Sequence, residues 1–350
     1  KKKLLSVLMA AVMVAGVGGV GAAQVKADDE KILGAGIYSA SDNFNSYIGK
    51  AITHACDGIF KTNIEDGQND QSTQNNQVDT MLAKGASAVA VSVCDVTAAP
   101  TLIQKCKDAG NVPIIFFNKE ITDYDVINSY ENAYQVTSTG GDYGASIQAQ
   151  MVIDYWKEHP EMDKNGDGKL QLVYLMGDPG HTASQPRCDY LKSTIEDAGI
   201  EIDLLAEDTG MWVTATAKEK MDAWVSKYGD EIECCVAGND AMALGALSAV
   251  EAAGFNTDGE ESSKYIPIYG IDALPEILSK IESGEITGSV LQDAKTQGQT
   301  IVKMAENLTS GKDAVDGIEG VEVEEEAKAV RVPYQAITKD NLDLAKSTYE

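Results

Sequence analysis

The stretch IECCVAGNDAMALGALSAVEA, residues 232–252, contains the unit that decides the fold. A largely apolar run, Ile232–Ala237, is followed by a glycine and the polar pair Asn239-Asp240, and then by Ala241–Ala252. The first run is short and bounded by Gly, Asn and Asp, which is typical of a strand, and the second is longer and typical of a helix. The stretch therefore predicts a buried strand, a polar turn and a helix.

The same unit recurs along two halves of the chain. In the first half we expect strands at Ile32–Ile37, Ala88–Val93, Val112–Phe117 and Tyr134–Val136, and helices at Phe44–Ile59, Gln74–Ala83 and Thr97–Ala109. In the second half we expect strands at Leu170–Met176, Ile200–Leu205, Ile232–Ala237, Ile266–Ile271 and Gly288–Leu291, and helices at Ala183–Ala198, Thr214–Ser226, Ala241–Ala252 and Pro275–Ile281. Strands regularly separated by helices predict parallel sheets covered on both faces. The fold class is therefore α/β, with two doubly wound parallel-sheet domains.

Polar residues follow these strands, at the edge where parallel α/β sheets bind ligands. Because they come from both halves of the chain, we expect a ligand between two domains that close on it. The residues concerned are Tyr38, Asp42, Ser92, Asn118, Gly177–Arg187, Asn239, Asp240, Asp272 and Gln292.

The N-terminal residues 1–27 have the pattern of a secretory signal peptide. Three lysines precede the apolar and glycine run Leu4–Val20, and Val25-Lys26-Ala27 offers small residues for cleavage. Val17 stands where a lipobox would have its cysteine, so a lipid anchor is not expected. We expect an exported protein, at the cell surface or in the periplasm.

Charge and cysteine usage exclude other classes. The formal net charge is −27, which argues against nucleic acid or an anionic membrane as a partner, since both attract lysine and arginine. The six cysteines show no disulfide spacing, and we expect free, mostly buried thiols.

The segment Asp163–Gln171, DKNGDGKLQ, predicts a calcium site. Oxygen-bearing side chains at positions 1, 3 and 5, with Gly168 at the sixth, match the loop of an EF-hand. However, Tyr174 stands at position 12, where an EF-hand has a bidentate Glu, and a strand follows instead of a helix. The segment is either a calcium loop completed from elsewhere in the chain or an Asx-rich turn.

A second set of residues suits a pyranose. Carboxylate, amide and guanidinium groups fix hydroxyl orientation, and aromatic rings cover C–H faces. The sequence offers little support for catalysis, since only three histidines are present and no nucleophile elbow or Walker A motif occurs. A glycosidase using Asp42 and Asp272 stays open as an alternative. The polar candidates are Asp42, His181, Arg187, Asn239 and Asp272, and the aromatic ones are Phe44 and Trp212.

From about Ile32 to Asn341 the chain resembles the galactose/glucose-binding proteins of ABC transport, within the periplasmic binding protein superfamily. The motifs that carry the resemblance are Asp42–Phe44, Gln68–Ser72, Phe116–Glu120, Gly177–His181, Met211-Trp212, Lys220–Trp224, Asn239–Ala243, Asp272–Glu276 and Val330–Tyr334.

The resemblance implies roles at matching positions. Phe44 and Trp212 would sandwich the sugar, and Tyr38 would line the mouth of the site. The hydrogen-bonding residues would be Asp42, His181, Arg187, Asn239 and Asp272. Calcium would be held by Asp163, Asn165, Asp167 and Gln171, by the Lys169 carbonyl and by the distant Glu233.

Three pocket positions depart from the family pattern. Ser92 and Gln292 replace Asn, and Ala183 replaces the Asp that would meet the anomeric hydroxyl. A pocket that is open there would admit a β-galactoside as well as the free hexose.

The resemblance also implies a bilobal fold crossed three times by the chain. One lobe would comprise residues 28–138 plus 292–328, and the other residues 139–291 plus 329–350. The expected function is hexose binding without catalysis, as a monomer. The expected partners are an ABC permease with a separate ATPase and, as a further candidate, a chemoreceptor. A transcriptional regulator's effector domain shares this fold, but the expected signal peptide argues against it.

Overall fold

The computed structural model describes residues 31–138, 141–260 and 262–349, which form one compact unit. The predicted signal peptide, residues 1–27, lies outside the described residues. No helix within the described ranges is long and apolar enough to cross a membrane.

The first lobe is built on a sheet whose strand order is β11-β12-β5-β4-β3-β1-β2. All its pairings are parallel except that of β11 with β12. Its strands are β1 (Ile32–Ile37), β2 (Lys61–Asp66), β3 (Ala88–Val91), β4 (Ile114–Phe117), β5 (Ala133–Ser138), β11 (Glu322–Glu324) and β12 (Ala329–Val332). Its helices are α1 (Asn43–Ala55), α2 (Gln71–Ala83), α3 (Ala99–Asp108), α4 (Tyr124–Asn128) and α10 (Ala294–Thr309).

The second lobe repeats this arrangement with the parallel order β7-β6-β8-β9, extended by β10 and β13. Its strands are β6 (Lys169–Met176), β7 (Glu201–Thr209), β8 (Cys234–Ala237), β9 (Ile268–Tyr269), β10 (Ser289–Leu291) and β13 (Gln335–Ile337). Its helices are α5 (Gly141–Glu158), α6 (Ser184–Asp197), α7 (Thr214–Tyr228), α8 (Asp240–Ala252), α9 (Pro275–Glu282) and α11 (Leu342–Tyr349).

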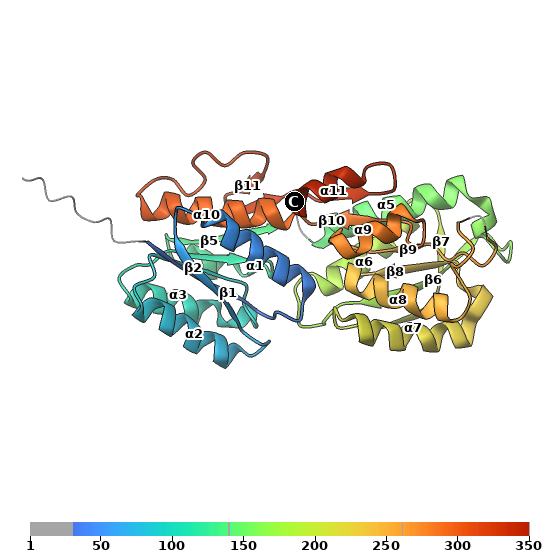
Figure 1. Cartoon of the computed structure of the whole chain (residues 1–350), viewed down its shortest axis with the longest axis horizontal. Helices are drawn as coiled ribbons and strands as arrows, with labels where there is room; N and C mark the ends of the chain where they lie inside the picture. Colours follow the sequence, from blue (N-terminus) through green and yellow to red (C-terminus); the bar gives the residue numbers. More distant parts are fainter. Residues whose placement is uncertain (1–30, 139–140, 261, 350) are drawn as a thin grey trace, which may run out of the picture. The chain divides into compact units, whose positions relative to one another are not determined.

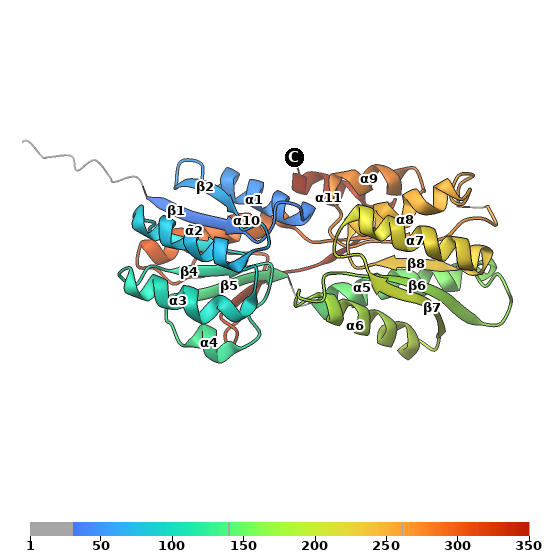
Figure 2. The same ribbon diagram turned by 90° about the horizontal axis from the view of Figure 1, so that it is seen from below.

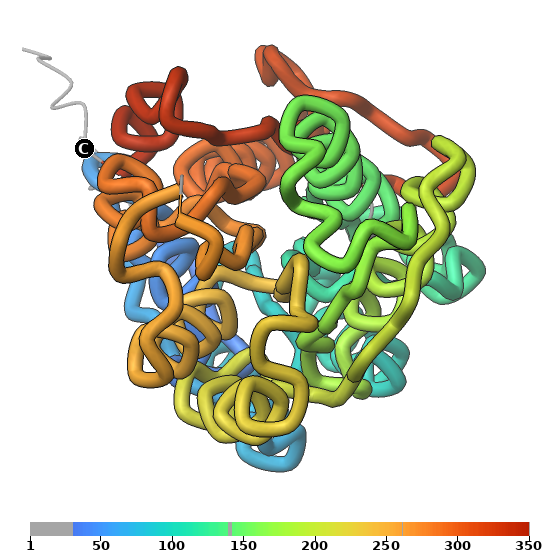
Figure 3. Tube along the Cα trace, turned by 90° about the vertical axis from the view of Figure 1, so that its right-hand side faces the viewer, coloured from blue at the N-terminus to red at the C-terminus, as the bar shows by residue number. Residues whose placement is uncertain are grey.

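Both sheets have helices on both faces, as alternate side chains of the strands show. In β6, Val173 and Leu175 belong to the core formed with α7 and α8, whereas Leu172 and Tyr174 belong to the core formed with α5 and α6. In the first lobe, α1 and α10 cover one face and α2 and α3 the other (Figures 1 and 2). Figure 3, with the second lobe toward the viewer, separates α5 in green from α7 and α8 in yellow. The predicted doubly wound α/β fold is confirmed.

The chain passes between the lobes three times, as predicted. The crossings lie between β5 and α5, between β10 and α10, and between β12 and β13. The predicted boundary at residue 328 is wrong, because Ala329–Val332 pairs in parallel with β5 and therefore belongs to the first lobe. Only the chain from β13 onward returns to the second lobe.

The six cysteines are free thiols, as expected. Five are buried, and Cys94 is half-buried. Burial raises the pKa of the Cys234 and Cys235 thiols, which keeps these adjacent groups protonated and unreactive.

Candidate functional site

Two predicted site residues are N-caps of helices that start at strand ends. Asp42 precedes α1, and its Oδ1 accepts a hydrogen bond from the Asn45 N–H at 2.9 Å. Asn239 precedes α8, and its Oδ1 accepts from the Met242 N–H at 3.0 Å. Because an N-cap lies between strand and helix, both side chains are held at the carboxyl ends of their sheets.

One small cavity gathers residues from both lobes and from the second crossing. Eight of the ten residues predicted to bind a ligand line it, together with Asn118. Whether they bind a ligand stays a prediction. The lining residues are Asp42, Phe44, Asn118, His181, Arg187, Trp212, Asn239, Asp272 and Gln292.

This inner cavity is largely filled by its own side chains. Its volume is about 20 Å³. One water molecule needs roughly 10–15 Å³. The His181 ring packs edge-on to Trp212, with ring centroids 5.4 Å apart, and to Tyr38, at 6.1 Å. A ligand larger than water therefore enters only when these side chains or the lobes move apart.

Trp212 is placed by an unusual backbone. Met211 and Trp212 both have positive φ, at 56° and 63°, which side-chain-bearing residues rarely adopt. The indole also needs Gly177, since a Cβ there would lie 2.0 Å from the ring. Strained backbone of this kind is concentrated at functional sites, and Asn118 and Asp272 also have positive φ, at 65° and 124°.

Arg187, on α6, places a buried charge beside the cavity. Its Nη1 donates to the Gly238 carbonyl at 2.6 Å, and its Nη2 donates to Gln292 Oε1 at 2.8 Å and to the Tyr334 hydroxyl at 3.1 Å. The guanidinium also lies over the Trp212 ring, 5.6 Å from its centroid. Arg187 Nε and Trp212 Nε1 are buried without a hydrogen-bond partner. Two unused donors beside one cavity call for a ligand with acceptor oxygens.

His181 is neutral in this setting. Burial lowers its pKa well below the usual value, and the nearby Lys119 and Arg187 charges lower it further. Its Nδ1 accepts from the Ala183 N–H at 3.1 Å, which leaves the proton on Nε2, 3.4 Å from Asn118 Oδ1. The ring therefore presents a donor toward the first lobe.

Tyr38 and Ser92 also belong to the predicted ligand-binding set, but they do not line the inner cavity. The Tyr38 hydroxyl donates to Asp42 Oδ2, and Ser92 Oγ donates to Asn118 Oδ1 at 3.4 Å. Each orients a residue that does reach the cavity. Asn118, a predicted strand-end residue that is not in the predicted ligand-binding set, does line the cavity, and its backbone is left-handed.

Two buried carboxyl groups share the end of the second sheet. Asp240 accepts from Ser289 Oγ at 2.6 Å and from the Leu274 N–H at 2.8 Å. Burial raises its pKa to about 8. Burial and the neighbouring Asp240 raise the pKa of Asp272 well above the usual range. Both Asp240 and Asp272 therefore hold their protons to higher pH than an exposed aspartic acid does.

The predicted calcium loop lies at the start of β6. Asp163 Oδ1 accepts from the N–H groups of Gly166, at 2.8 Å, and Asp167, at 3.1 Å. Glu233 joins from the strand side, accepting from the N–H groups of Lys164, at 2.6 Å, and Gln171, at 3.0 Å.

Two observations test this loop as a metal site. In its favour, Gln171 Oε1 is a buried oxygen with no hydrogen-bond partner. Against a site of acidic ligands alone, no group of three or more His, Cys, Asp or Glu residues is arranged to hold a metal in the described part of the chain. The residues therefore fit a cation only if amide and backbone oxygens complete the set, as a hard cation such as calcium accepts.

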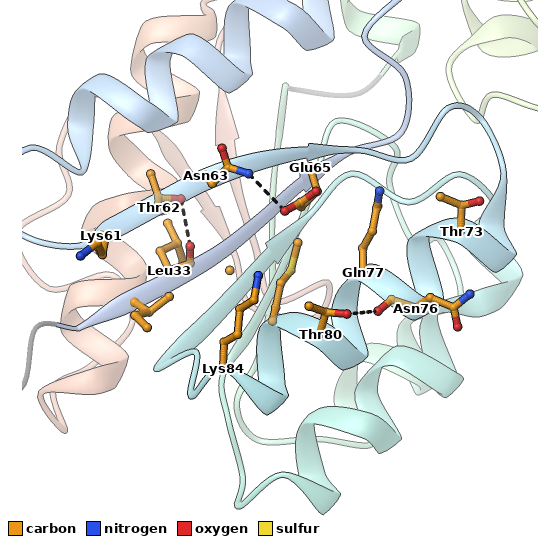
Figure 4. Close-up of a pocket in the computed structure, with 13 residues that line it drawn as sticks. Leu33, Lys61, Thr62, Asn63, Glu65, Thr73, Asn76, Gln77, Thr80 and Lys84 are labelled. Carbon is orange, nitrogen blue, oxygen red and sulfur yellow. Dashed lines mark hydrogen bonds between the residues drawn. The ribbon is translucent and has the colours of Figure 1, made fainter.

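A separate cavity of about 540 Å³ lies between α2 and the edge strand β2. In Figure 4, Thr62 Oγ1 donates to the Leu33 carbonyl at 2.9 Å and Asn63 donates to Glu65 at 3.1 Å. Gln77 Oε1, which also belongs to the lining, is buried without a hydrogen-bond partner. None of the predicted site residues lines it.

Comparison with known proteins gives consistent matches over nearly the whole chain. The family described as periplasmic binding protein domain matches residues 35–313. The D-galactose/methyl-galactoside binding periplasmic protein MglB of Haemophilus influenzae is 41% identical over 326 residues, covering 92% of this chain and 94% of that protein. A putative rhizopine-binding protein of Rhizobium meliloti is 29% identical over 314 residues, covering 89% and 91%.

Solved structures agree on the fold. An ABC transporter solute-binding protein from Bacillus halodurans with bound myo-inositol matches with a TM-score of 0.72 and 27% identity, covering 91% of this chain and 98% of that one. The binding protein of the arabinose ABC transporter from Shewanella matches with a TM-score of 0.74 at 16% identity, covering 91% and 96%, which supports the fold alone.

Asp240 makes the stability of the ligand-free protein depend on pH. The pKa of Asp240 is higher in the folded protein than in the unfolded chain, where it is about 4. The contribution of its protonated form to the free energy of unfolding is therefore complete at acid pH and is lost as pH rises toward 8. We expect Asp240 alone to lower the free energy of unfolding by up to about 1.4 kcal/mol per pH unit in this window. In Asp240→Asn, whose amide oxygen can accept from the Leu274 N–H while its NH2 donates to Ser289 Oγ, the fall should be smaller.

Urea denaturation at pH 5, 6, 7 and 8 measures this, with the exposed Asp340→Asn as the matched control. An Asp240→Asn profile parallel to that of the wild type would contradict the assignment.

Proposed function

Because this chain belongs to the periplasmic binding protein domain family, we propose that it is an exported binding protein that captures a hexose between its lobes and delivers it to an ABC permease. Galactose or glucose is the favoured ligand, since the relative from Haemophilus influenzae is named for galactose and methyl-galactoside. The observation that carries the proposal is the pair of buried, unpartnered donors, Arg187 Nε and Trp212 Nε1, beside the inner cavity.

The residues around the cavity match the surface of a pyranose. Asp42 and Asn118 from the first lobe face Arg187, Asn239 and Asp272. A hydroxyl both donates and accepts, so carboxylate, amide and guanidinium groups fix its orientation. Phe44 and Trp212 provide aromatic surface for the C–H faces of the ring.

Binding requires the lobes to open and close, because the inner cavity is too small for a hexose as it stands. The three crossings are the places where such a motion would be absorbed. Closure would then bury the sugar and bring surfaces of both lobes into the arrangement that a permease recognises.

The chain is a binding protein and not an enzyme. Its relatives and structural neighbours are likewise named as binding proteins. Asp42, which the glycosidase alternative needs, is committed to the Tyr38 hydroxyl and the Asn45 N–H. A carboxylate held by these two donors would orient a hydroxyl of the sugar.

Trp212 is the most direct test of the hexose site. We expect galactose or glucose to change its fluorescence, and Trp212→Ala to weaken binding by roughly 2–4 kcal/mol, as for a buried aromatic hot spot. Trp156, which does not line the cavity, provides the control: Trp156→Phe should keep both the affinity and the signal. Near-normal affinity of Trp212→Ala would give Trp212 a purely structural role.

Ala183, which stands where the family pattern has an Asp, affects which sugars the site would accept. The nearby Gln185 cannot fill the gap, since its side chain donates to Asp189 at 2.8 Å on the exposed side of α6. We infer that the anomeric hydroxyl lacks a charged partner, so that a substituent there is tolerated.

Methyl β-galactoside should therefore bind about as tightly as galactose, because a site without the bonding group discriminates little. Ala183→Asp should shift preference toward the free sugar. Calorimetry with both ligands measures this, with Gln185→Ala as the control. A wild-type preference for galactose of about tenfold or more would show that the site still bonds the anomeric hydroxyl.

We further infer that the Asp163–Gln171 loop binds calcium, with Glu233 completing the site. The proposed ligands are the side chains of Asp163, Asn165, Asp167, Gln171 and Glu233 and the Lys169 carbonyl. Support comes from the unpartnered Gln171 Oε1 and from the position of Glu233 against the loop. The ion would supply positive charge that ties the loop to the start of β8.

Chelation should lower the melting temperature, since a ligand that binds only the folded state stabilises it by about 2.7 kcal/mol at one hundred times its Kd. Comparing each variant with calcium and with EGTA separates metal binding from intrinsic stability. Glu233→Gln should lose most of the calcium-dependent shift, whereas Tyr174→Phe should keep it. Equal losses, or no shift in the wild type, would mean that Glu233 does not complete a calcium site.

A further inference from the structure

A second cavity, of about 600 Å³, adjoins the inner one and is here called the vestibule. The two cavities share four lining residues, Asn118, His181, Arg187 and Gln292. A ligand in the inner cavity would therefore be separated from the vestibule only by side chains that line both. The size of the vestibule is within the range of small-molecule sites, about 300–1,000 Å³.

Ala183 lines the vestibule but not the inner cavity. By resemblance, this is the position from which the family's Asp meets the anomeric hydroxyl. With only a methyl group at this place, the carbon that carries a sugar's aglycone would face the larger cavity. The sequence departure and the neighbouring space thus lie on the same side of the site.

Aromatic surface is available in the vestibule. Tyr143, on α5, is 52% exposed and Tyr190, on α6, is 47% exposed, and both line it. Large side chains that are exposed inside a cavity offer faces on which the C–H groups of a sugar can stack. The hydroxyl group of Thr182 adds a hydrogen-bonding partner.

Charge in the vestibule selects against anions. Arg331 is already paired, with Glu120 at 2.8 Å and with Glu324 at 2.6 Å, and Arg187 is committed to its own partners. Asp142 and Glu322 add negative charge. A phosphorylated or otherwise acidic group would meet excess carboxylate, whereas a neutral sugar would meet acceptors for its hydroxyl groups.

We propose that the vestibule is a second sugar subsite, so that the protein binds neutral β-galactosyl disaccharides with the galactose in the inner cavity. This rests on the proposed hexose function. The inner cavity holds the terminal sugar, and the vestibule holds the second sugar against Tyr143 and Tyr190.

Calorimetry of the whole protein with galactose, methyl β-galactoside and lactose tests the subsite. The Kd of lactose should lie within about tenfold of the Kd of methyl β-galactoside, because stacking of the second sugar on a tyrosine offsets the cost of placing it in the vestibule. One stacked aromatic ring changes affinity by up to about tenfold. Tyr190→Ala and Tyr143→Ala should each weaken lactose about two- to tenfold and leave the other two ligands unchanged. Tyr190→Phe, which keeps the ring, should behave like the wild type.

Two results would overturn the subsite while leaving the hexose site intact. One is lactose binding about a hundredfold or more weaker than methyl β-galactoside. The other is an equal effect of the tyrosine truncations on all three ligands. Failure of galactose and methyl β-galactoside themselves to bind would instead overturn the proposed hexose function, and the subsite with it.

Discussion

The buried guanidinium of Arg187 is the constraint on which the site depends. A buried charge costs several kcal/mol unless it is hydrogen-bonded, and Arg187 is only 5% exposed. Its partners are the Gly238 carbonyl at the end of β8, Gln292 in the second crossing and Tyr334 in the third. Satisfying one charge therefore holds the sheet end and two interlobe segments together. Its Nε is buried without a hydrogen-bond partner and can donate to a ligand.

The other site residues are positioned by the way strands turn into helices. Asp42 and Asn239 are N-caps, so their side chains cannot leave the sheet ends without exposing helix N–H groups. Asn118, Trp212 and Asp272 have positive φ, and this strained backbone turns them toward the cavity. The architecture thus fixes most of the site before any ligand is present. What remains free to change is the distance between the lobes.

The fold followed from the sequence wherever strands were apolar and ended in Gly, Asn or Asp. It failed at β2, because KTNIED is a polar edge strand, and at α5 and α10, which follow directly on interlobe crossings. The third crossing was misplaced because β12 and β13 read as one continuous segment, and only pairing with β5 assigns β12 to the first lobe. Most of the predicted site residues line the inner cavity, because polar residues at strand ends are visible in the sequence. The predicted set does not include Asn118, which lines the inner cavity through its left-handed backbone, and it includes Tyr38 and Ser92, which do not line that cavity.

The central claim is that the two lobes meet around a neutral hexose bound by Arg187 and its neighbours. Isothermal titration calorimetry of the wild-type protein with galactose, glucose and ribose tests it most directly. The account predicts saturable binding of one molecule of galactose or glucose per chain, with a Kd of about micromolar or tighter, and much weaker binding of ribose. Absence of saturable binding by either hexose to the folded protein, or tighter binding of ribose, would contradict it.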